Sequence, residues 1–234
     1  MTRGKLQSYD AGAYNLLNSR ITNLTDMPGC REPLIEGATA NYPNTVTDID
    51  GNVYEIVNIG PMCWLKENLR TTRYRNADLI ANIQGDNEWA TTTQGAWSNY
   101  DNDPSLDIYG KVYNGFAATN PAGLCPEGWR VPTIQELNDL VQYAGGNNAS
   151  TALKDTSTWT PAGTNTSGFT ALAAGWRHES GSFSGIGSSS IFISQTVSSS
   201  QQSYAKRIFD NQDFIFGVGV EPNYGSSCRC IKDE

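Results

Sequence analysis

Apolar residues recur at helical spacing in one segment near the middle of the chain. Those that share one face are Ile134, Leu137, Leu140 and Val141. Thr133 directly precedes this run, and Glu136 lies three positions after Thr133, which is the pattern of a capping box. Pro132 disfavours helix in the residue before it. Gly145 and Gly146 interrupt the pattern. The sequence therefore predicts an amphipathic helix between Thr133 and Gly145.

Alternating apolar and polar positions predict strands elsewhere. Residues 45–49 and 52–59 alternate on either side of the turn pair Asp50–Gly51, as a hairpin requires. Chain breakers are frequent before this hairpin, so we expect residues 1–44 to form an N-terminal arm and residues 45–234 to form one compact domain. In a further predicted strand, Tyr204, Lys206 and Ile208 share one face and residues 205, 207 and 209 share the other.

Charge and composition exclude several classes of partner. The 234 residues have a formal net charge of −8 and no cluster of Lys or Arg, which argues against binding to nucleic acid or to anionic membranes. No run of about 18 apolar residues is present, so we expect no membrane span. The low charged fraction, 17%, suits a loop-rich extracellular protein, although no signal peptide is visible.

The five cysteines do not form a recognisable metal site. Cys228 and Cys230 are two residues apart, so they share one face of a strand or supply half of a metal site, but His178 is the only histidine and lies far away in the sequence. We therefore predict no metal and no cofactor. For an exported protein, two disulfides and one remaining thiol are expected.

No set of residues with the pattern of a catalytic centre is evident. The one histidine gives no Ser-His-Asp or Cys-His set that the sequence places near a nucleophile. The Gly-rich stretch 181–190 lacks the Lys and the strand-to-helix context of a phosphate-binding loop. We expect that the protein is not an enzyme.

Six motifs in order resemble the FISUMP-type "major paralogous domain" family, over roughly residues 45–234. They are Asp50-Gly51-Asn52-Val53-Tyr54, the segment 62–69 with Met62-Cys63-Trp64-Leu65, Tyr109-Gly110-Lys111-Val112-Tyr113-Asn114, the segment 124–133 with Cys125-Pro126-Glu127-Gly128-Trp129-Arg130, Ser167-Gly168-Phe169-Thr170-Ala171-Leu172, and the segment 225–233 with Cys228-Arg229-Cys230. The resemblance implies an α+β fold that is C-type-lectin-like, of the subtype seen in formylglycine-generating enzymes, with few helices, short strands and long ordered loops. It also implies a protein at the cell surface or outside the cell, and a relation to the variable proteins of diversity-generating retroelements.

The same resemblance suggests how the cysteines pair. Cys125 and Cys230 lie in the two best-matched motifs, so we expect a disulfide between the helix entry and the final strand. Cys30 with Cys63 is a second expectation, which leaves Cys228 as a free thiol.

The segment 191–224 is the predicted ligand-binding surface. It mixes aromatic residues with Ser, Gln, Asn and Asp, as antibody contact loops do. At Ile193 the chain departs from an aromatic residue that is common in the family, which we interpret as a change on a surface, and the family pattern places Ile208 inward, which leaves Arg207 and Phe209 outward. The predicted binding residues are Phe192, Ile193, Gln195, Arg207, Phe209, Asp210, Gln212, Asp213, Phe216 and Tyr224.

These features predict a receptor-like or adhesin-like protein that binds a protein or glycan on another cell or surface. Residues between Ile191 and Tyr224 are expected to vary among related proteins while the scaffold stays fixed. One alternative is a structural subunit or tip of a surface assembly, and the oligomeric state is open. Another is a calcium-dependent lectin, because Glu221-Pro222-Asn223 matches a sugar-binding tripeptide, although no Trp-Asn-Asp-like segment follows it.

Overall fold

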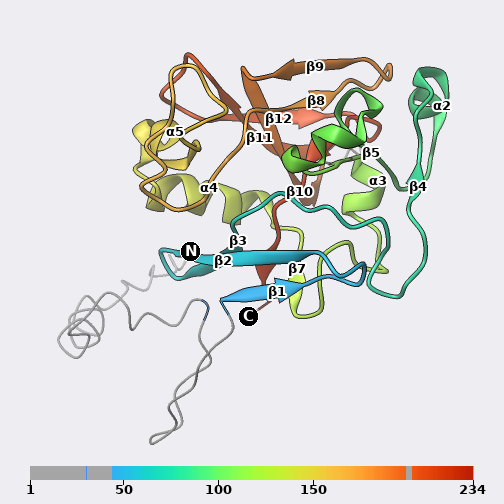
Figure 1. Cartoon of the computed structure of the whole chain (residues 1–234), viewed down its shortest axis with the longest axis horizontal. Helices are drawn as coiled ribbons and strands as arrows, with labels where there is room; N and C mark the ends of the chain where they lie inside the picture. Colours follow the sequence, from blue (N-terminus) through green and yellow to red (C-terminus); the bar gives the residue numbers. More distant parts are fainter. Residues whose placement is uncertain (1–29, 31–43, 199–201, 234) are drawn as a thin grey trace, which may run out of the picture.

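The computed structural model describes residue 30, residues 44–198 and residues 202–233. Of the predicted N-terminal arm, only Cys30 and Asn44 fall within this part, so the expectation for the arm lies outside the described residues. The described chain folds into two sheets with a few short helices at their edges (Figure 1).

Five strands form the smaller sheet within the described part, in the order β1-β2-β3-β14-β7. Their bounds are β1 Thr45–Thr47, β2 Val53–Ile59, β3 Met62–Leu65, β7 Trp129–Arg130 and β14 Ile231–Lys232. The predicted hairpin is confirmed as β1 and β2. Its turn forms because the Asp48 carboxylate accepts the backbone N–H groups of Asp50 (3.0 Å) and Asn52 (2.9 Å), and Gly51 adopts a φ of 86°.

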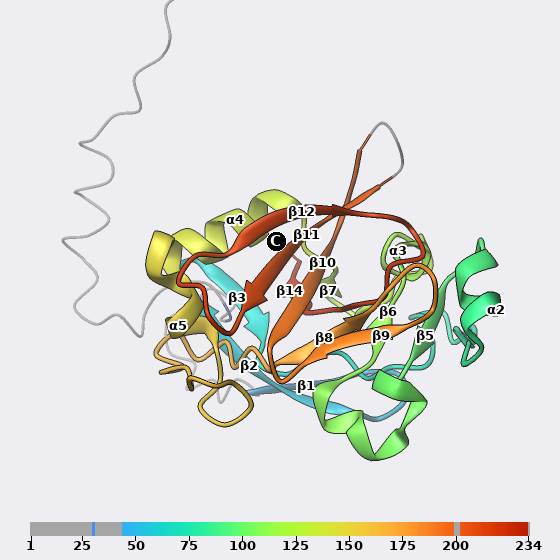
Figure 2. The same cartoon turned by 90° about the horizontal axis from the view of Figure 1, so that it is seen from above.

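The larger sheet comprises nine strands of the described chain. Its main path is β12-β11-β10-β13-β6-β5-β4, while β8 pairs with β10 and β9 pairs with β8. The strands are β4 Ala81–Asn82, β5 Ala96–Ser98, β6 Val112–Tyr113, β8 Ala174–Arg177, β9 Phe183–Ile186, β10 Ser189–Val197, β11 Ser203–Phe209, β12 Phe216–Val220 and β13 Ser226–Ser227. Seen from above, β12, β11, β10, β8 and β9 extend across the top of the molecule (Figure 2).

The helices are short and lie at the edges of the sheets. They are α2 Asp86–Thr91, α3 Gly115–Ala118, α4 Ile134–Tyr143 and α5 Ala149–Leu153, with the 3₁₀ helices η2 Tyr100–Asn102, η3 Pro104–Tyr109 and η4 Gly146–Asn148. The class is therefore mixed α+β, with more strand than helix. None of the helices in the described residues is long and apolar enough to cross a membrane.

The predicted helix is confirmed as α4, together with its cap. Thr133 accepts the backbone N–H of Glu136, and the Glu136 carboxylate accepts the backbone N–H of Thr133 at 2.7 Å. The same carboxylate binds the guanidinium of Arg130 from β7 through two hydrogen bonds of 2.8 and 2.5 Å. Burial opposes ionisation of Glu136, but the hydrogen bonds from Arg130 and Thr133 outweigh it and lower its pKa below the ordinary 4.5.

This lowered pKa predicts an acid-dependent loss of stability. A carboxyl whose folded pKa is depressed stabilises the fold above its unfolded pKa, and this contribution disappears as the pH falls through the folded pKa. We expect Glu136→Gln to reduce the free energy of unfolding by about 1–2 kcal/mol at neutral pH and by progressively less as the pH falls below 4.5 toward the lowered folded pKa. Urea titrations of both proteins at several pH values measure this; a difference that does not depend on pH would contradict it.

The main core is formed where the two sheets and the helices α4 and α5 pack against one another. One cluster joins apolar residues of α4 and α5 to Trp64, Phe169, Phe192 and Ile208. The rings of Trp64 and Phe169 meet edge to face at 5.9 Å, and those of Phe169 and Phe192 at 5.4 Å. The guanidinium of Arg229, which is fully buried, lies 4.2 Å from the Phe169 ring. Ile208 is buried in this cluster, as the family pattern implied.

All five cysteines fall within the described residues, and both expected disulfides are present. Cys125 and Cys230 have Cα atoms 6.0 Å apart and connect the segment before β7 to the segment before β14. Cys30 and Cys63 have Cα atoms 4.8 Å apart and attach residue 30 to β3. Cys228 is a buried free thiol.

Burial makes this thiol chemically inert. It raises the pKa of Cys228 to about 12, and the neighbouring Arg229 offsets only part of the effect. We therefore expect the native protein to react with a thiol reagent such as dithiobisnitrobenzoate far more slowly than the same protein in urea. Equal rates in both conditions would show that the site opens readily in solution.

Candidate functional site

Strands β8, β11 and β12 present a row of large, partly exposed side chains on the face opposite the main core. We call this set the aromatic surface: Trp176, Arg207, Phe209, Phe214, Phe216 and Tyr224. Figure 2 looks onto these strands. The set brings together three strands and two loops that are distant in the sequence.

Strand alternation places these side chains. In β11, Ala205, Arg207 and Phe209 share a face, and the antiparallel register sets Arg207 opposite Phe216 of β12. Beside Arg207 on the same face, Ile191, Ala205 and Val220 form a small buried cluster against which Trp176 and Tyr224 pack. The aromatic surface therefore has a rigid, apolar support that is separate from the main core.

The guanidinium of Arg207 lies at the centre of the aromatic surface. Its Cζ is 3.9 Å from the ring centroid of Trp176 and 4.2 Å from that of Phe209. Its Nε donates a hydrogen bond of 3.1 Å to Ser189 Oγ. Among the described residues, no carboxylate forms an ion pair with Arg207. The charge is thus held in place by rings and remains available to an acceptor from outside.

The remaining aromatic rings extend this contact area. Phe209 meets Phe216 edge to face, with centroids 5.5 Å apart, and Phe216 meets Phe214 at 4.3 Å. Phe214 is 46% exposed, so the row ends at solvent. Rigid rings of this kind offer a large apolar contact at low cost in side-chain entropy.

Burial shifts the titration of the two polar members in opposite directions. It lowers the pKa of Arg207, an effect that Tyr224 partly offsets, and it raises the pKa of Tyr224. At neutral pH the surface therefore combines a charged guanidinium with a neutral phenol. The His178 ring packs edge to face on Tyr224, with centroids 5.7 Å apart, and its Nε2 lies 3.2 Å from Glu179 Oε2. Both contacts are with nearby residues at the margin of the aromatic surface.

A glycine and a buried arginine hold Trp176 in place. A Cβ on Gly185 of β9 would lie 1.9 Å from the Trp176 ring, so only glycine, here at a φ of +81°, permits this close approach. The next residue of β8, Arg177, is fully buried and donates to the carbonyl oxygens of Gly181, Ile83 and Gln84 at 2.5 to 2.9 Å. It thereby fixes the β8–β9 hairpin to the segment before α2.

The structure brings four of the predicted binding residues into the aromatic surface: Arg207, Phe209, Phe216 and Tyr224. Asp210, Gln212 and Asp213 lie on the loop that connects Phe209 to Phe216, at its margin. The backbone of this loop is held by Lys154, whose Nζ donates to Asp210 O at 2.9 Å, and by Ser150, whose N–H donates to Asp213 O at 3.2 Å. Gln195 is exposed but lies toward the opposite end of the β10–β11 pair from Phe209.

Two of the predicted residues are part of the core, so their assignment to a surface was wrong. Phe192 is 2% exposed and stacks on Phe169, and Ile193 is fully buried in the cluster around the disulfides. Strand β10 runs through the middle of the larger sheet, and both of its faces are covered: Phe192 packs in the cluster with α4 and α5, and Ile193 packs in the cluster around the disulfides. A ligand has no access to either residue in this structure.

Trp176 is the member that the sequence-based prediction missed. It lies outside the segment 191–224 and reaches the aromatic surface because β8 pairs in parallel with β10, at Ser190 opposite Gly175. The sequence around Trp176 is a run of small apolar residues without alternation, so it does not reveal the partner strand.

The tripeptide Glu221-Pro222-Asn223 has a structural role. The Asn223 side-chain amide donates to the carbonyl oxygens of Trp89 (2.8 Å) and Thr92 (2.7 Å), and the backbone oxygen of Asn223 accepts from Trp89 Nε1 at 2.6 Å. Glu221 accepts a hydrogen bond of 2.8 Å from Gln202. These contacts attach the turn to the end of α2.

Among the described residues, one group of three potential metal ligands was found. The sulfur atoms of Cys125, Cys228 and Cys230 lie within 4.8 Å of one another. Since Cys125 and Cys230 are joined in a disulfide, their sulfurs are not thiolates and do not provide a metal site in this state.

Comparison with known proteins identifies the family. Neither the search among curated proteins nor the search among solved structures gave a match. Residues 57–232 match the model of the family described as the Fibrobacter succinogenes major domain, in agreement with the resemblance predicted from the six motifs. This match covers more than half of the chain, and the protein therefore belongs to the Fibrobacter succinogenes major domain family.

Proposed function

We propose that the protein is an exported, non-enzymatic binding protein of receptor or adhesin type, with a C-type-lectin-like scaffold and the aromatic surface as its contact site. The observation that supports this most strongly is the position of Arg207. Its charge stacks on Trp176 and Phe209 without an ion pair from the described residues. Trp, Tyr and Arg are the residues on which protein interfaces most often depend, particularly where a charge is partly desolvated among rings.

Two features support the location and the scaffold. Two disulfides suit an oxidising compartment, which favours the cell surface or the exterior. The capped helix α4, the short strands and the long ordered loops agree with what the resemblance to C-type-lectin-like proteins implies.

The chemistry of the free cysteine also supports the proposal that the protein is not an enzyme. The one free thiol of the described residues is buried with a raised pKa, so it is not poised as a nucleophile. The proposal is therefore one of recognition alone.

Sequence variation among related proteins is a further part of the proposal. Exposed positions of the aromatic surface and of the loop 210–215 are expected to vary, while Phe192, Ile193 and Ile208 stay apolar because they are buried. Substitution of outward side chains costs within about 0.5 kcal/mol, whereas core substitutions cost several. Sequencing sibling genes tests this, and variation concentrated in buried positions would contradict it.

The direct test uses one array that carries glycans and extracellular protein domains. It is probed with the labelled wild-type protein, with an Arg207→Ala/Phe214→Ser variant, and with Tyr143→Ser as the matched control. Tyr143 is 56% exposed on α4, so its loss removes an exposed ring of similar size outside the aromatic surface. If the double variant does not fold, Phe214→Ser alone replaces it, because that side chain is already largely in solvent.

The expected result is a set of hits that the control retains and the surface variant loses, with melting temperatures nearly unchanged. An array without hits, or hits that both variants retain, would overturn the proposal.

The second candidate is a structural subunit or tip of a surface assembly. The exposed rings of Phe214 and Tyr204 favour it, because copies of the chain could bury them. Size-exclusion chromatography with light scattering separates the two functions: a stable oligomer that hides Phe209 and Phe214 indicates assembly, whereas a monomer indicates a free receptor surface. Calcium-dependent lectin activity has the weakest support, since both side chains of the tripeptide are engaged, and a calcium-dependent rise in melting temperature would restore it.

A further inference from the structure

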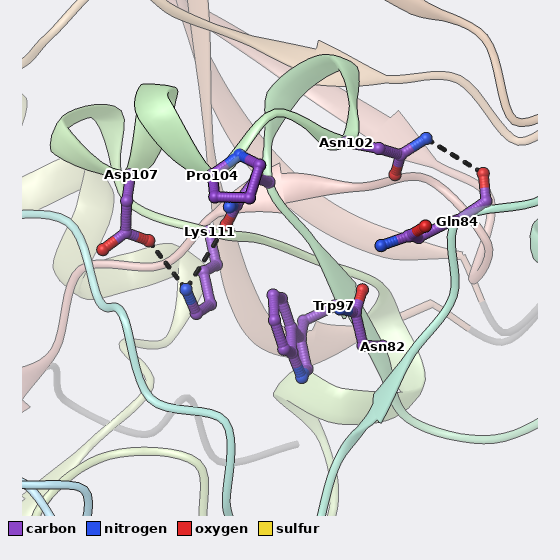
Figure 3. Close-up of a pocket in the computed structure, with 8 residues that line it drawn as sticks. Asn82, Gln84, Trp97, Asn102, Pro104, Asp107 and Lys111 are labelled. Atoms are coloured by element: carbon purple, nitrogen blue, oxygen red, sulfur yellow. Dashed lines mark hydrogen bonds and ion pairs between the residues drawn. The ribbon is translucent and has the colours of Figure 1, made fainter.

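A pocket that the proposed function does not use lies among elements that do not contribute to the aromatic surface. The pocket measures about 340 Å³, within the usual range for small-molecule sites. It lies between β4, β5 and the 3₁₀ helices η2 and η3 (Figure 3). Its lining consists of Asn82, Gln84, Trp97, Asn99, Asn102, Pro104, Asp107 and Lys111.

The one cation of this lining is already neutralised inside the pocket. Lys111 is nine-tenths buried, and its Nζ donates to Asp107 Oδ1 at 2.7 Å and to Asn99 Oδ1 at 3.3 Å. The same ammonium lies 4.5 Å from the ring centroid of Trp97. Because the charges of Lys111 and Asp107 cancel, an ionic ligand would have to compete with this pair, whereas a neutral ligand leaves it intact.

The amides that surround the pocket have unused hydrogen-bonding capacity. Asn102 Nδ2 donates to Gln84 O at 3.0 Å, but its Oδ1 is buried without a partner among the described residues. The side-chain amides of Asn82 and Gln84 are exposed and likewise form no hydrogen bond within the described part of the chain. Each amide group can both donate and accept, which is the property that a hydroxyl group also has.

The backbone at the pocket is held in an unusual conformation. Asp101 and Asn102 both adopt left-handed φ angles, 51° and 57°, in succession. Such conformations cost free energy and occur preferentially at functional sites. Here they direct the Asn102 side chain across the pocket toward Gln84, as Figure 3 shows.

We propose that this pocket binds a neutral pyranose unit of a saccharide. The exposed part of the Trp97 ring offers an apolar surface to the C–H face of the sugar, and the amides of Asn82, Gln84 and Asn102 exchange hydrogen bonds with its hydroxyl groups. The Lys111–Asp107 pair supplies a charged donor and acceptor at the pocket wall without net charge. An acidic or basic sugar meets no complementary net charge and is disfavoured.

Ligand-observed saturation-transfer NMR tests the proposal with methyl glycosides of glucose, galactose, mannose and xylose as probes. Glucuronate and glucosamine serve as charged counterparts. The site variant is Asn82→Ala/Gln84→Ala, which removes two exposed amides without a described partner. The matched control is Asn58→Ala/Gln142→Ala, which removes two exposed amides on β2 and α4.

We expect at least one neutral glycoside to bind the wild type and the control, and the site variant to bind it about tenfold more weakly, the effect of two lost hydrogen bonds. Trp97→Leu, checked for folding by its melting curve, is expected to lose binding as well. The Arg207→Ala/Phe214→Ser variant keeps it, so the two proposals fail separately. Binding that the site variant retains, or a preference for the charged sugars, would overturn the proposal.

A second experiment distinguishes binding of a free monosaccharide unit from binding of a unit within an oligosaccharide. Immobilised neutral oligosaccharides are offered beside the free glycosides. Binding to both assigns the pocket to single pyranose units, and binding to the oligosaccharides alone assigns it to units within a chain. Failure in both arms rejects saccharide binding.

Discussion

Replacing Arg229 by methionine is expected to lower the free energy of unfolding by about 3–5 kcal/mol. The side chain is fully buried, and its guanidinium donates to the carbonyl oxygens of Leu65 (3.1 Å), Phe169 and Thr170 (3.4 Å). It also donates twice to Asn68 Oδ1, at 2.7 and 3.2 Å. Methionine fills similar space but leaves all four acceptor atoms without this donor.

The loss is large because this side chain connects three parts of the fold. It joins the segment after β3, the loop at Phe169 and the segment before β14, and it stacks on Phe169 at 4.2 Å and near Phe192 at 5.6 Å. Burial lowers the pKa of Arg229 to about 9, so the group stays charged at neutral pH. Its charge is stabilised by oriented carbonyl dipoles rather than by a carboxylate in contact.

Urea unfolding of the variant measures the effect. Arg73→Met is the matched control, because Arg73 is partly exposed and pairs with Asp50 at 3.3 Å on the surface. The control is expected to lose less than about 1 kcal/mol. Equal losses for the two variants would show that the hydrogen bonds of Arg229 do not hold the fold together.

Removal of the Cys125–Cys230 disulfide is the second large effect, with an expected cost of about 4–5 kcal/mol. The bridge spans 105 residues, so its loss restores many conformations to the unfolded chain. The Cys30–Cys63 bridge spans 33 residues, and its removal is expected to cost about 1 kcal/mol less on the same basis.

Both comparisons require alanine at Cys228. Its sulfur lies within 4.8 Å of those of Cys125 and Cys230, so in the Cys30→Ala/Cys63→Ala variant this thiol is placed to exchange with the remaining bridge. The double variants Cys125→Ala/Cys230→Ala and Cys30→Ala/Cys63→Ala are therefore compared in a Cys228→Ala background. A greater loss on removing the shorter bridge would contradict the account.

Local patterns predicted the elements that depend on neighbouring residues. The capping box of α4 needs only Thr133 and Glu136, and the β1–β2 turn needs only Asp48 and Gly51, which are close in sequence, so both elements could be predicted from local patterns. The alternation of β11 likewise separated Ile208 from Arg207 and Phe209, and the family resemblance supplied the inward direction of Ile208. Family resemblance supplied the cysteine pairing, which spacing alone left open.

The remaining features depend on which strands become neighbours. Phe192 was assigned to a surface because its segment mixes aromatic with polar residues, and Ile193 because it departs from an aromatic residue that is common in the family. However, β10 is central in its sheet, and both of its faces are covered. Trp176 joins the aromatic surface only through the parallel pairing of β8 with β10. The pocket at Trp97 was missed for the same reason, since Asn82, Asn102 and Lys111 come together only in the folded chain.

The central claim is that the aromatic surface is where a partner binds, and hydroxyl-radical footprinting with a partner identified on the array tests it most directly. Bound partner is predicted to reduce oxidation of Phe214, Trp176 and Tyr224, while Tyr143 on α4, an exposed ring outside the surface, is oxidised as before. Protection of Tyr143 with unchanged oxidation of Phe214 and Trp176 would contradict the account.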